Sequence, residues 1–173
     1  MNKKTILTLF CFFSFSVLFA TAQSGVKQVY NPALDPMAQI DSALALTQRT
    51  EEPKYVLCQL GGNWCPWCLL FAEFVSRDTD INQLIQDNYV YIHVNYDPHL
   101  NHDESQKAKT KALLDRLGKP QRFGFPVLII LDQQGKVIHI QDSSFLEEGQ
   151  GYNKKKVLRF LKSWRPKAVN PSI

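Results

Sequence analysis

The sequence is poor in cysteine, with 4 among 173 residues, one of which lies in an apolar run near the N-terminus. The remaining three are an odd number, and two of them stand only three positions apart. An exported domain held together by structural disulfides usually has an even number of cysteines at wider spacing. The cysteine content therefore argues against a disulfide framework and favours a redox-active dithiol.

The sequence also lacks a strongly basic region. Lys3 and Lys4 lie in the first 22 residues, so 18 of the 20 lysines and arginines remain beyond them, against 16 acidic residues, a formal charge of +2. The one basic run, Lys154–Lys156, is typical of the solvated start of a helix. We expect no nucleic-acid partner, because binding to DNA or RNA requires a positive stripe or patch.

Only the N-terminus has a long apolar run. A short basic start precedes the stretch Ile6–Phe19, and the small residues Ala20–Ala22 follow it. This order is typical of a cleaved signal peptide, and a membrane span needs about 20 apolar residues. We predict a signal peptide over residues 1–22 and an exported protein, periplasmic or secreted. An uncleaved N-terminal anchor is the alternative.

Periodicity and turn residues predict one α/β domain over residues 35–164, after an N-terminal extension (23–34) and before a C-terminal tail (165–173) that holds little besides two prolines. β-Branched and aromatic residues predict strands at 55–60, 89–96, 126–131 and 136–140. Apolar spacing and caps predict helices starting at Pro36 and covering 66–76, 80–87, 101–118 and 153–164. Residues 119–124 are predicted as a loop, and no internal repeat is present. The alternation predicts a mixed sheet between helices.

The most informative motif is Trp64-Cys65-Pro66-Trp67-Cys68, which follows the strand predicted at 55–60 and the pair Gly61-Gly62. Two cysteines three positions apart come within bonding distance if a helix begins at the first. Pro66 suits the first turn of that helix, and the helix dipole would favour a thiolate at Cys65. A thiolate with a second thiol one turn away can attack a disulfide and then resolve the mixed intermediate.

With this motif, the chain resembles the thioredoxin family, and specifically its exported thiol–disulfide oxidoreductases, over about residues 35–164. The resemblance rests on the 64–68 motif after a strand, and on Phe125-Pro126 at the start of a strand before a hairpin and a last helix. It implies a thioredoxin-like fold, with a central mixed β-sheet flanked by helices. It also implies an enzyme, a protein thiol–disulfide oxidoreductase.

The resemblance implies a role for each matching residue. Cys65 would be the nucleophile, more exposed and lower in pKa than Cys68, the buried resolving cysteine. Pro126 would be the cis-proline, which packs beside the pair and leaves nearby backbone free to align an extended substrate. The residues expected to contact substrate are Trp64, Pro66, Trp67, Phe125 and Pro126. Pro66 and Trp67 would also tune the redox potential.

The expected cycle needs no bound cofactor, because Cys65 and Cys68 alternate between dithiol and disulfide. The expected partners are cysteine-containing exported proteins, together with a membrane or soluble redox partner. We expect a monomer. The motif leaves the direction of exchange open, because a low pKa at Cys65 makes an oxidant and an ordinary one makes a reductant.

Two residues depart from the family pattern. The family commonly has a buried acid six positions before the first cysteine, as a proton relay for the resolving thiol, whereas this chain has Gln59, which cannot exchange a proton. We predict that His93 or a buried water takes over the relay; an ordinary histidine hydrogen-bonded at the core edge is the alternative. Phe125 is bulkier than the threonine, valine or isoleucine usual before the proline, which leaves the set of partners open.

The remaining cysteine and two further histidines also have alternative interpretations. Cys58 lies within an apolar strand and is predicted to be an inert core residue. His99 and His102 could bind a metal together with the pair, but they precede a polar helix in a predicted surface loop, so we assign no metal site. The alternative functions are a metal-binding or metallochaperone module and a non-catalytic thioredoxin-like binding domain with a structural disulfide.

Overall fold

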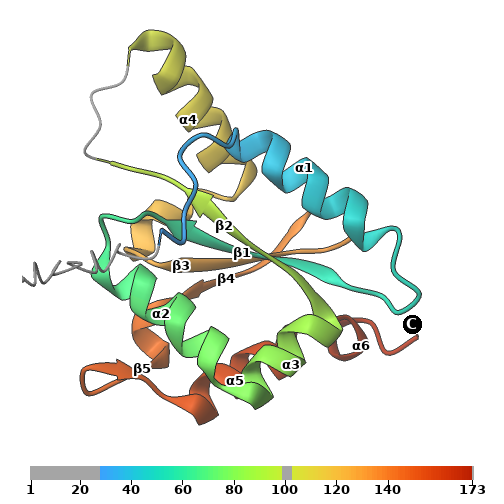
Figure 1. Cartoon of the computed structure of the whole chain (residues 1–173). Helices are drawn as coiled ribbons and strands as arrows, with labels where there is room; N and C mark the ends of the chain where they lie inside the picture. The colour runs from blue at the N-terminus through green and yellow to red at the C-terminus, as the bar shows by residue number, and fades with distance from the viewer. Residues whose placement is uncertain (1–27, 99–102, 173) are drawn as a thin grey trace, which may run out of the picture.

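The computed structural model describes residues 28–98 and 103–172. Within them, a four-stranded sheet lies between two layers of helices (Figure 1). The strand order is β2-β1-β3-β4; β1 is parallel to β2, and β3 is antiparallel to both of its neighbours. The predicted mixed sheet flanked by helices is therefore confirmed.

Each strand and helix predicted from the sequence is present, with small differences at the ends. The strands of the sheet are β1 (Tyr55–Gly61), β2 (Tyr89–Asn95), β3 (Val127–Leu131) and β4 (Val137–Asp142). The helices are α1 (Pro36–Thr47), α2 (Pro66–Arg77), α3 (Thr79–Asn88), α4 (Glu104–Arg116), α5 (Lys154–Trp164) and α6 (Pro166–Val169). A small hairpin of β5 (Glu147–Glu148) and β6 (Gly151–Tyr152) precedes α5.

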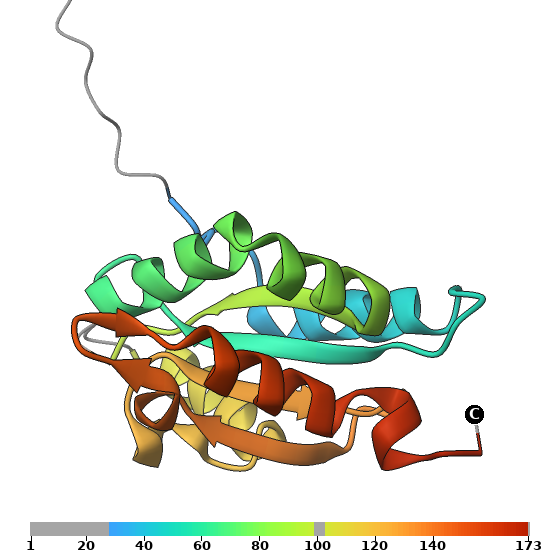
Figure 2. The ribbon, with the colours of Figure 1, turned by 90° about the horizontal axis from the view of Figure 1, so that it is seen from below.

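The two faces of the sheet have separate cores, because successive side chains of a strand point to opposite faces. On β1, Val56, Cys58 and Leu60 pack against α1 and α4, whereas Tyr55 and Leu57 pack against α2, α3 and α5. Turned by 90°, the molecule shows α2 leading into α3, with α5 beside them on this second face (Figure 2). All seven residues of β1 are buried, so this central strand fixes the position of whatever follows its carboxyl end.

Two segments predicted to be irregular contain short helices. The predicted loop 119–124 holds a 3₁₀ helix, Pro120–Phe123, and the predicted tail 165–173 holds α6. Each of these helices begins at a proline, whose fixed φ suits the first helical position. The predictions were wrong here because a four-residue helix is too short to show an apolar period.

Helix α4 begins at Glu104, later than the predicted start at residue 101. Asp103 caps it: its carboxylate accepts from the Gln106 amide, and the Gln106 side chain accepts from the Asp103 amide. This capping box satisfies amides that would otherwise lack partners at the helix start.

Several predictions lie outside the described residues. They are the signal peptide at 1–22, the first part of the extension at 23–34, and the two histidines considered as metal ligands, His99 and His102. Within 28–98 and 103–172, no helix is both long enough and apolar enough to span a membrane.

Candidate active site

The two cysteines of the motif form a disulfide where β1 ends and α2 begins. Cys65 is the N-cap of α2, and Cys68 lies one turn along the helix, with 5.2 Å between the two Cα atoms. The Cys68 amide donates to the Cys65 sulfur at 3.2 Å. Cys65 is 5 % exposed and Cys68 is 0 % exposed, so the small accessible surface of the pair belongs to Cys65.

Glycine at position 61 lets the end of β1 approach the pair closely. A Cβ on Gly61 would lie 2.5 Å from the Cys68 sulfur and 3.0 Å from the hydroxyl oxygen of Tyr30. Side chains do not tolerate such distances, so any larger residue would displace one of these groups. The sequence therefore needs glycine at this position for a reason specific to the redox pair.

The segment before β3 reaches the pair from a distant part of the chain. The Phe125–Pro126 peptide bond is cis, and the Phe125 carbonyl oxygen lies 3.6 Å from the Cys65 sulfur. Pro126 is buried, and β3 starts directly after it. The structure thus brings together Phe125, Pro126 and the cysteine pair, as the family resemblance implies.

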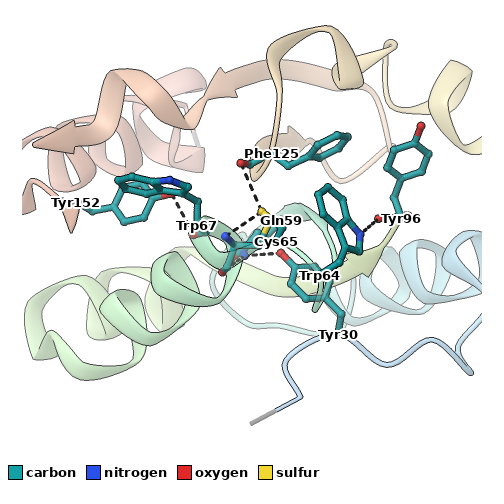
Figure 3. The surroundings of a disulfide bond; sticks show 9 residues. Tyr30, Gln59, Trp64, Cys65, Trp67, Tyr96, Phe125 and Tyr152 are labelled. Atoms are coloured by element: carbon teal, nitrogen blue, oxygen red, sulfur yellow. Dashed lines mark hydrogen bonds between the residues drawn. A yellow bond between two sulfur atoms is a disulfide. The ribbon is translucent and has the colours of Figure 1, made fainter. Parts of the chain in front are cut away.

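An aromatic cluster, formed by Trp64, Tyr96 and Phe125, lies on one side of the pair (Figure 3). Trp64 is 37 % exposed, its indole N–H donates to the Tyr96 carbonyl oxygen at 3.0 Å, and its ring meets that of Phe125 edge to face at 5.4 Å. Tyr96 was not predicted as a site residue. Its position at the end of the predicted strand 89–96, at the same sheet end as Cys65, was the signal in the sequence.

Trp67 lies on the other side of the pair and has a different environment. Its ring packs edge to face on Tyr152 of β6, and the Tyr152 hydroxyl donates to the Trp67 carbonyl oxygen at 3.2 Å (Figure 3). The ring also packs against the core between the sheet, α2 and α5. Trp67 therefore fixes the start of α2 as well as bordering the pair, whereas Pro66 beside it is exposed.

Gln59 lies behind the pair, on the face of β1 that looks toward α2, and is fully buried. Its amide nitrogen donates to the Cys68 carbonyl oxygen at 2.9 Å and to the Tyr30 hydroxyl at 2.5 Å, while its amide oxygen accepts from the Tyr91 hydroxyl. Burial raises the pKa of both tyrosines, which keeps them neutral. A neutral polar network thus stands where the family commonly has an acid.

His93 is paired with Gln59 in the parallel register of β1 and β2, but no hydrogen bond of the described residues joins the two side chains. Its Nε2 is buried without a hydrogen-bond partner in that part of the chain, and burial lowers its pKa to about 4. The ring contacts Tyr30 and Tyr91 instead. A relay through His93 therefore stays a prediction.

Tyr30 was not predicted from the sequence as a residue of the site. It belongs to the predicted N-terminal extension, yet it is 0 % exposed and packs with both cysteines. Asn63 holds it there: the Asn63 side-chain oxygen accepts from the amides of Val29 and Tyr30, and its amide donates to the Tyr30 carbonyl. A lone tyrosine in a segment without periodicity gives no signal in the sequence.

Cys58 is buried and free, on the sheet face opposite Gln59. The predicted core position is confirmed, and burial raises the pKa of the thiol to about 12, which favours the unreactive thiol form. Among residues 28–98 and 103–172, no group of three His, Cys, Asp or Glu side chains is arranged to hold a metal ion.

Comparisons with known proteins agree with this geometry. A family model described as a thioredoxin-like domain matches residues 40–142, more than half of the chain. A search of the curated proteins found no match.

Two solved structures match the chain. A disulphide isomerase from Xylella fastidiosa Temecula1 is 22% identical, with a TM-score of 0.61 over 78% of this chain and 94% of that one. A DsbH oxidoreductase is 19% identical, with a TM-score of 0.49 over 72% of this chain and 82% of that one. The first supports the thioredoxin-like fold. With the family match over residues 40–142, it shows that the chain belongs to the family of thioredoxin-like domains.

Proposed function

We propose that this protein is an exported thiol–disulfide oxidoreductase that exchanges disulfides with cysteine-containing proteins. The observation that carries the proposal is the Cys65–Cys68 disulfide at the start of α2, beside the Phe125–Pro126 segment of a thioredoxin-like domain. A structural disulfide has no need of a nearby backbone carbonyl and an exposed tryptophan ring beside its more exposed cysteine.

In the proposed cycle, Cys65 is the nucleophile and Cys68 resolves. The Cys65 thiolate attacks a substrate disulfide, the substrate S–S bond breaks, and one substrate sulfur leaves as a thiolate and takes up a proton. Cys68 then loses its proton and attacks the Cys65 sulfur, which forms the Cys65–Cys68 disulfide and releases the second substrate sulfur. Two electrons pass to the substrate, and the reverse sequence oxidises substrate thiols. No bound cofactor is needed.

The local environment supports this division of roles. Cys65 has the accessible surface of the pair, and its sulfur accepts a hydrogen bond from the Cys68 amide at the first turn of α2. Amides and the dipole at a helix N-terminus favour a negative charge, so they stabilise a thiolate at Cys65 more than at Cys68.

Substrate would lie against the surface around Cys65. The aromatic cluster, with exposed Trp64 and half-buried Phe125, gives this surface an apolar character. Exposed Pro66 and buried Pro126 complete the border of the cysteine pair. Such a surface suits a cysteine flanked by apolar side chains, as in an unfolded or extended protein segment.

Export is part of the proposal and is supported by the residue pattern of the predicted signal peptide, 1–22. In an oxidising compartment, a reductant needs a dedicated electron donor, and an oxidant needs an acceptor. We therefore include a membrane or soluble redox partner, whose identity follows from the direction of exchange. In cells that make the full chain, N-terminal sequencing of the exported protein should find a start near Gln23.

The activity is tested by assaying reduction of insulin disulfides and oxidation of reduced, unfolded ribonuclease. Cys65→Ser should abolish both reactions, Cys68→Ser should accumulate substrates covalently attached to Cys65, and Cys58→Ser serves as the matched control with activity retained. A reduction potential of the cysteine pair below about −300 mV, together with no turnover, would instead indicate a structural disulfide. A stoichiometric metal ion on the reduced protein would favour the metal-binding alternative.

A further inference from the structure

Tyr30 lies at the redox pair although it is outside the part of the chain that the family model matches, residues 40–142. Its ring is fully buried, and the three hydrogen bonds of Asn63 fix its backbone to the loop just before Cys65. These hydrogen bonds attach the segment around Tyr30 directly to the active-site loop. Figure 3 shows Tyr30 approaching the pair beside Gln59.

The hydrogen bonds of Gln59 determine whether the Tyr30 hydroxyl accepts from this amide or donates to it. The Cys68 carbonyl oxygen only accepts, so the amide nitrogen of Gln59 must face it. The Tyr91 hydroxyl donates to the amide oxygen on the other side, which is consistent with that orientation. The second N–H of Gln59 therefore points to Tyr30, whose oxygen accepts it and whose own hydrogen must point elsewhere.

The resolving cysteine lies near the Tyr30 hydroxyl. The Tyr30 hydroxyl oxygen and the Cys68 sulfur flank the same point, at 3.0 and 2.5 Å from where a Cβ on Gly61 would lie. His93 Nε2, which has no hydrogen-bond partner in the described chain, is a second group with acceptor capacity near the Tyr30 ring. In the disulfide form, no hydrogen bond of the described residues joins Tyr30 to Cys68. Reduction frees the Cys68 sulfur from Cys65 and allows it to carry a charge.

The titratable groups that pack with Cys68 are Tyr30 and Cys65. One contact further away are Tyr91, which donates to Gln59, His93, which contacts Tyr91, and Tyr152, which donates to the Trp67 carbonyl. No carboxylate hydrogen-bonds to Gln59, Tyr30 or Tyr91 within residues 28–98 and 103–172. A thiolate at Cys68 therefore depends on neutral hydrogen-bond donors, because a buried charge without donors is strongly disfavoured.

We propose that Tyr30 donates its hydroxyl hydrogen to the Cys68 sulfur in the reduced protein and stabilises the thiolate that resolves the mixed disulfide. The inference rests on the proposed function, because that function is what gives the Cys68 thiolate a role in turnover. In the resolving step, the Cys68 proton passes to solvent and the sulfur attacks Cys65. The bond between Cys65 and the substrate sulfur breaks, and the substrate leaves as a thiolate. Tyr30 keeps its proton throughout, in agreement with a buried phenol.

The test compares Tyr30→Phe with the unchanged protein in two measurements that need no natural substrate. In a Cys65→Ser background, the ultraviolet absorbance of the thiolate is followed as a function of pH. In the protein with both cysteines, release of a chromogenic aromatic thiol from a preformed mixed disulfide on Cys65 gives the rate of resolution. Since a hydrogen bond to a charged group is lost, we expect the pKa of Cys68 to rise by about one unit and resolution at neutral pH to slow about tenfold.

The slowing should disappear at a pH above the raised pKa of Cys68, a response that a merely structural role would not give. Tyr89→Phe is the matched control: it removes a buried hydroxyl that donates to the Leu161 carbonyl oxygen, at the far end of β2, and should leave both measurements unchanged. Asn63→Ala, which loosens the segment but keeps the hydroxyl, should shift both in the same direction as Tyr30→Phe.

Unchanged values in both Tyr30→Phe and Asn63→Ala would overturn the inference. Failure of the proposed function would look different: insulin and ribonuclease would not be turned over, while the pKa of Cys68 would still respond to Tyr30→Phe.

Discussion

At the scale of single residues, Gln59 makes the buried hydrogen-bond network behind the cysteine pair a neutral one. An amide at the buried position can donate twice and accept, and here it uses both capacities to join Cys68, Tyr30 and Tyr91. Because it is neutral at every pH, its burial carries no cost of desolvating a charge. In the described part of the chain, no carboxylate behind the pair is then available for proton exchange, which leaves the thiols themselves, solvent and the predicted His93 relay.

His93 predicts a pH dependence of stability. Burial lowers its pKa from 6.5 to about 4 in the folded protein, so between these values the unfolded chain binds a proton that the folded chain does not. The contribution to stability is therefore complete above pH 6.5 and is lost as the pH falls toward 4. Relative to His93→Gln, the unchanged protein should lose up to about 3 kcal/mol over this range, as measured by urea unfolding at several pH values.

His139→Gln is the control for this prediction, because His139 is only partly buried and stacks on Trp164 at the other end of the molecule. A smaller pH-dependent change is expected there. Parallel stability curves for His93→Gln and the unchanged protein would contradict the prediction. The same variant tests the relay: oxidation and reduction rates that are unchanged from pH 5 to 9 would exclude His93 as the proton relay.

At the scale of elements, Asp78 joins three helices. It ends α2, its carboxylate accepts from the amides of Asp80 and Ile81 at the start of α3, and it lies 2.9 Å from the ammonium group of Lys154 on α5. These helices cover the sheet face that carries Gln59, so Asp78 helps to hold α2 in its position.

Substitution of Asp78 should separate its two contributions. Asp78→Ala removes both the cap and the ion pair and should lower the free energy of unfolding by about 1–2 kcal/mol. Asp78→Asn keeps a capping oxygen and should lose much less, since an ion pair near the surface contributes little. Urea unfolding measures both. Asp80→Asn, which removes an exposed partner of Lys154, is the control, and equal effects of Asn and Ala at position 78 would contradict the capping role.

At the scale of the whole molecule, three distant parts of the chain meet at one end of the sheet. Tyr30 comes from the N-terminal segment, the cysteine pair follows β1, and Phe125 precedes β3. Because strand β1 lies between β2 and β3, the ends of both neighbours reach the pair, which is how Tyr96 and Phe125 come to form one aromatic cluster with Trp64.

The aromatic cluster predicts a difference between large and small substrates. Phe125→Val removes the ring that contacts both Trp64 and Tyr96, and should lower kcat/KM for protein disulfides by about three- to tenfold. The rate with a small aromatic disulfide should change little, because such a substrate needs only the sulfur of Cys65. Parallel assays of both substrates check this.

Phe145→Ala provides the comparison, because Phe145 is 72 % exposed and lies in the 3₁₀ helix Ser143–Leu146 that follows β4. It should leave both rates unchanged. An equal loss on small and protein substrates in Phe125→Val would show that the ring supports the pair itself and does not contact substrate.

Local patterns in the amino-acid sequence were enough for the fold class, the order of strands and helices, and the pairing of Cys65 with Cys68. The continuous apolar run of β1 indicates a strand buried on both faces, and the apolar residues of α2 indicate a helix packed into the core, because that information lies within a few neighbouring residues. The prolines at the first position of longer helices are also recognised from neighbouring residues. A short helix such as α6 is not predicted, because it is too short to show an apolar period.

Tertiary packing alone decided what surrounds the cysteines. Tyr30 and Gln59 are 29 positions apart, and Cys65 and Phe125 are 60 positions apart, so no local pattern connects them. Their contacts arise because the sheet brings strand ends together and because Gly61 leaves room for Tyr30 beside Cys68. The residues that can perform the chemistry are therefore visible in the sequence, whereas the groups that tune it are chosen by close packing at the end of the sheet.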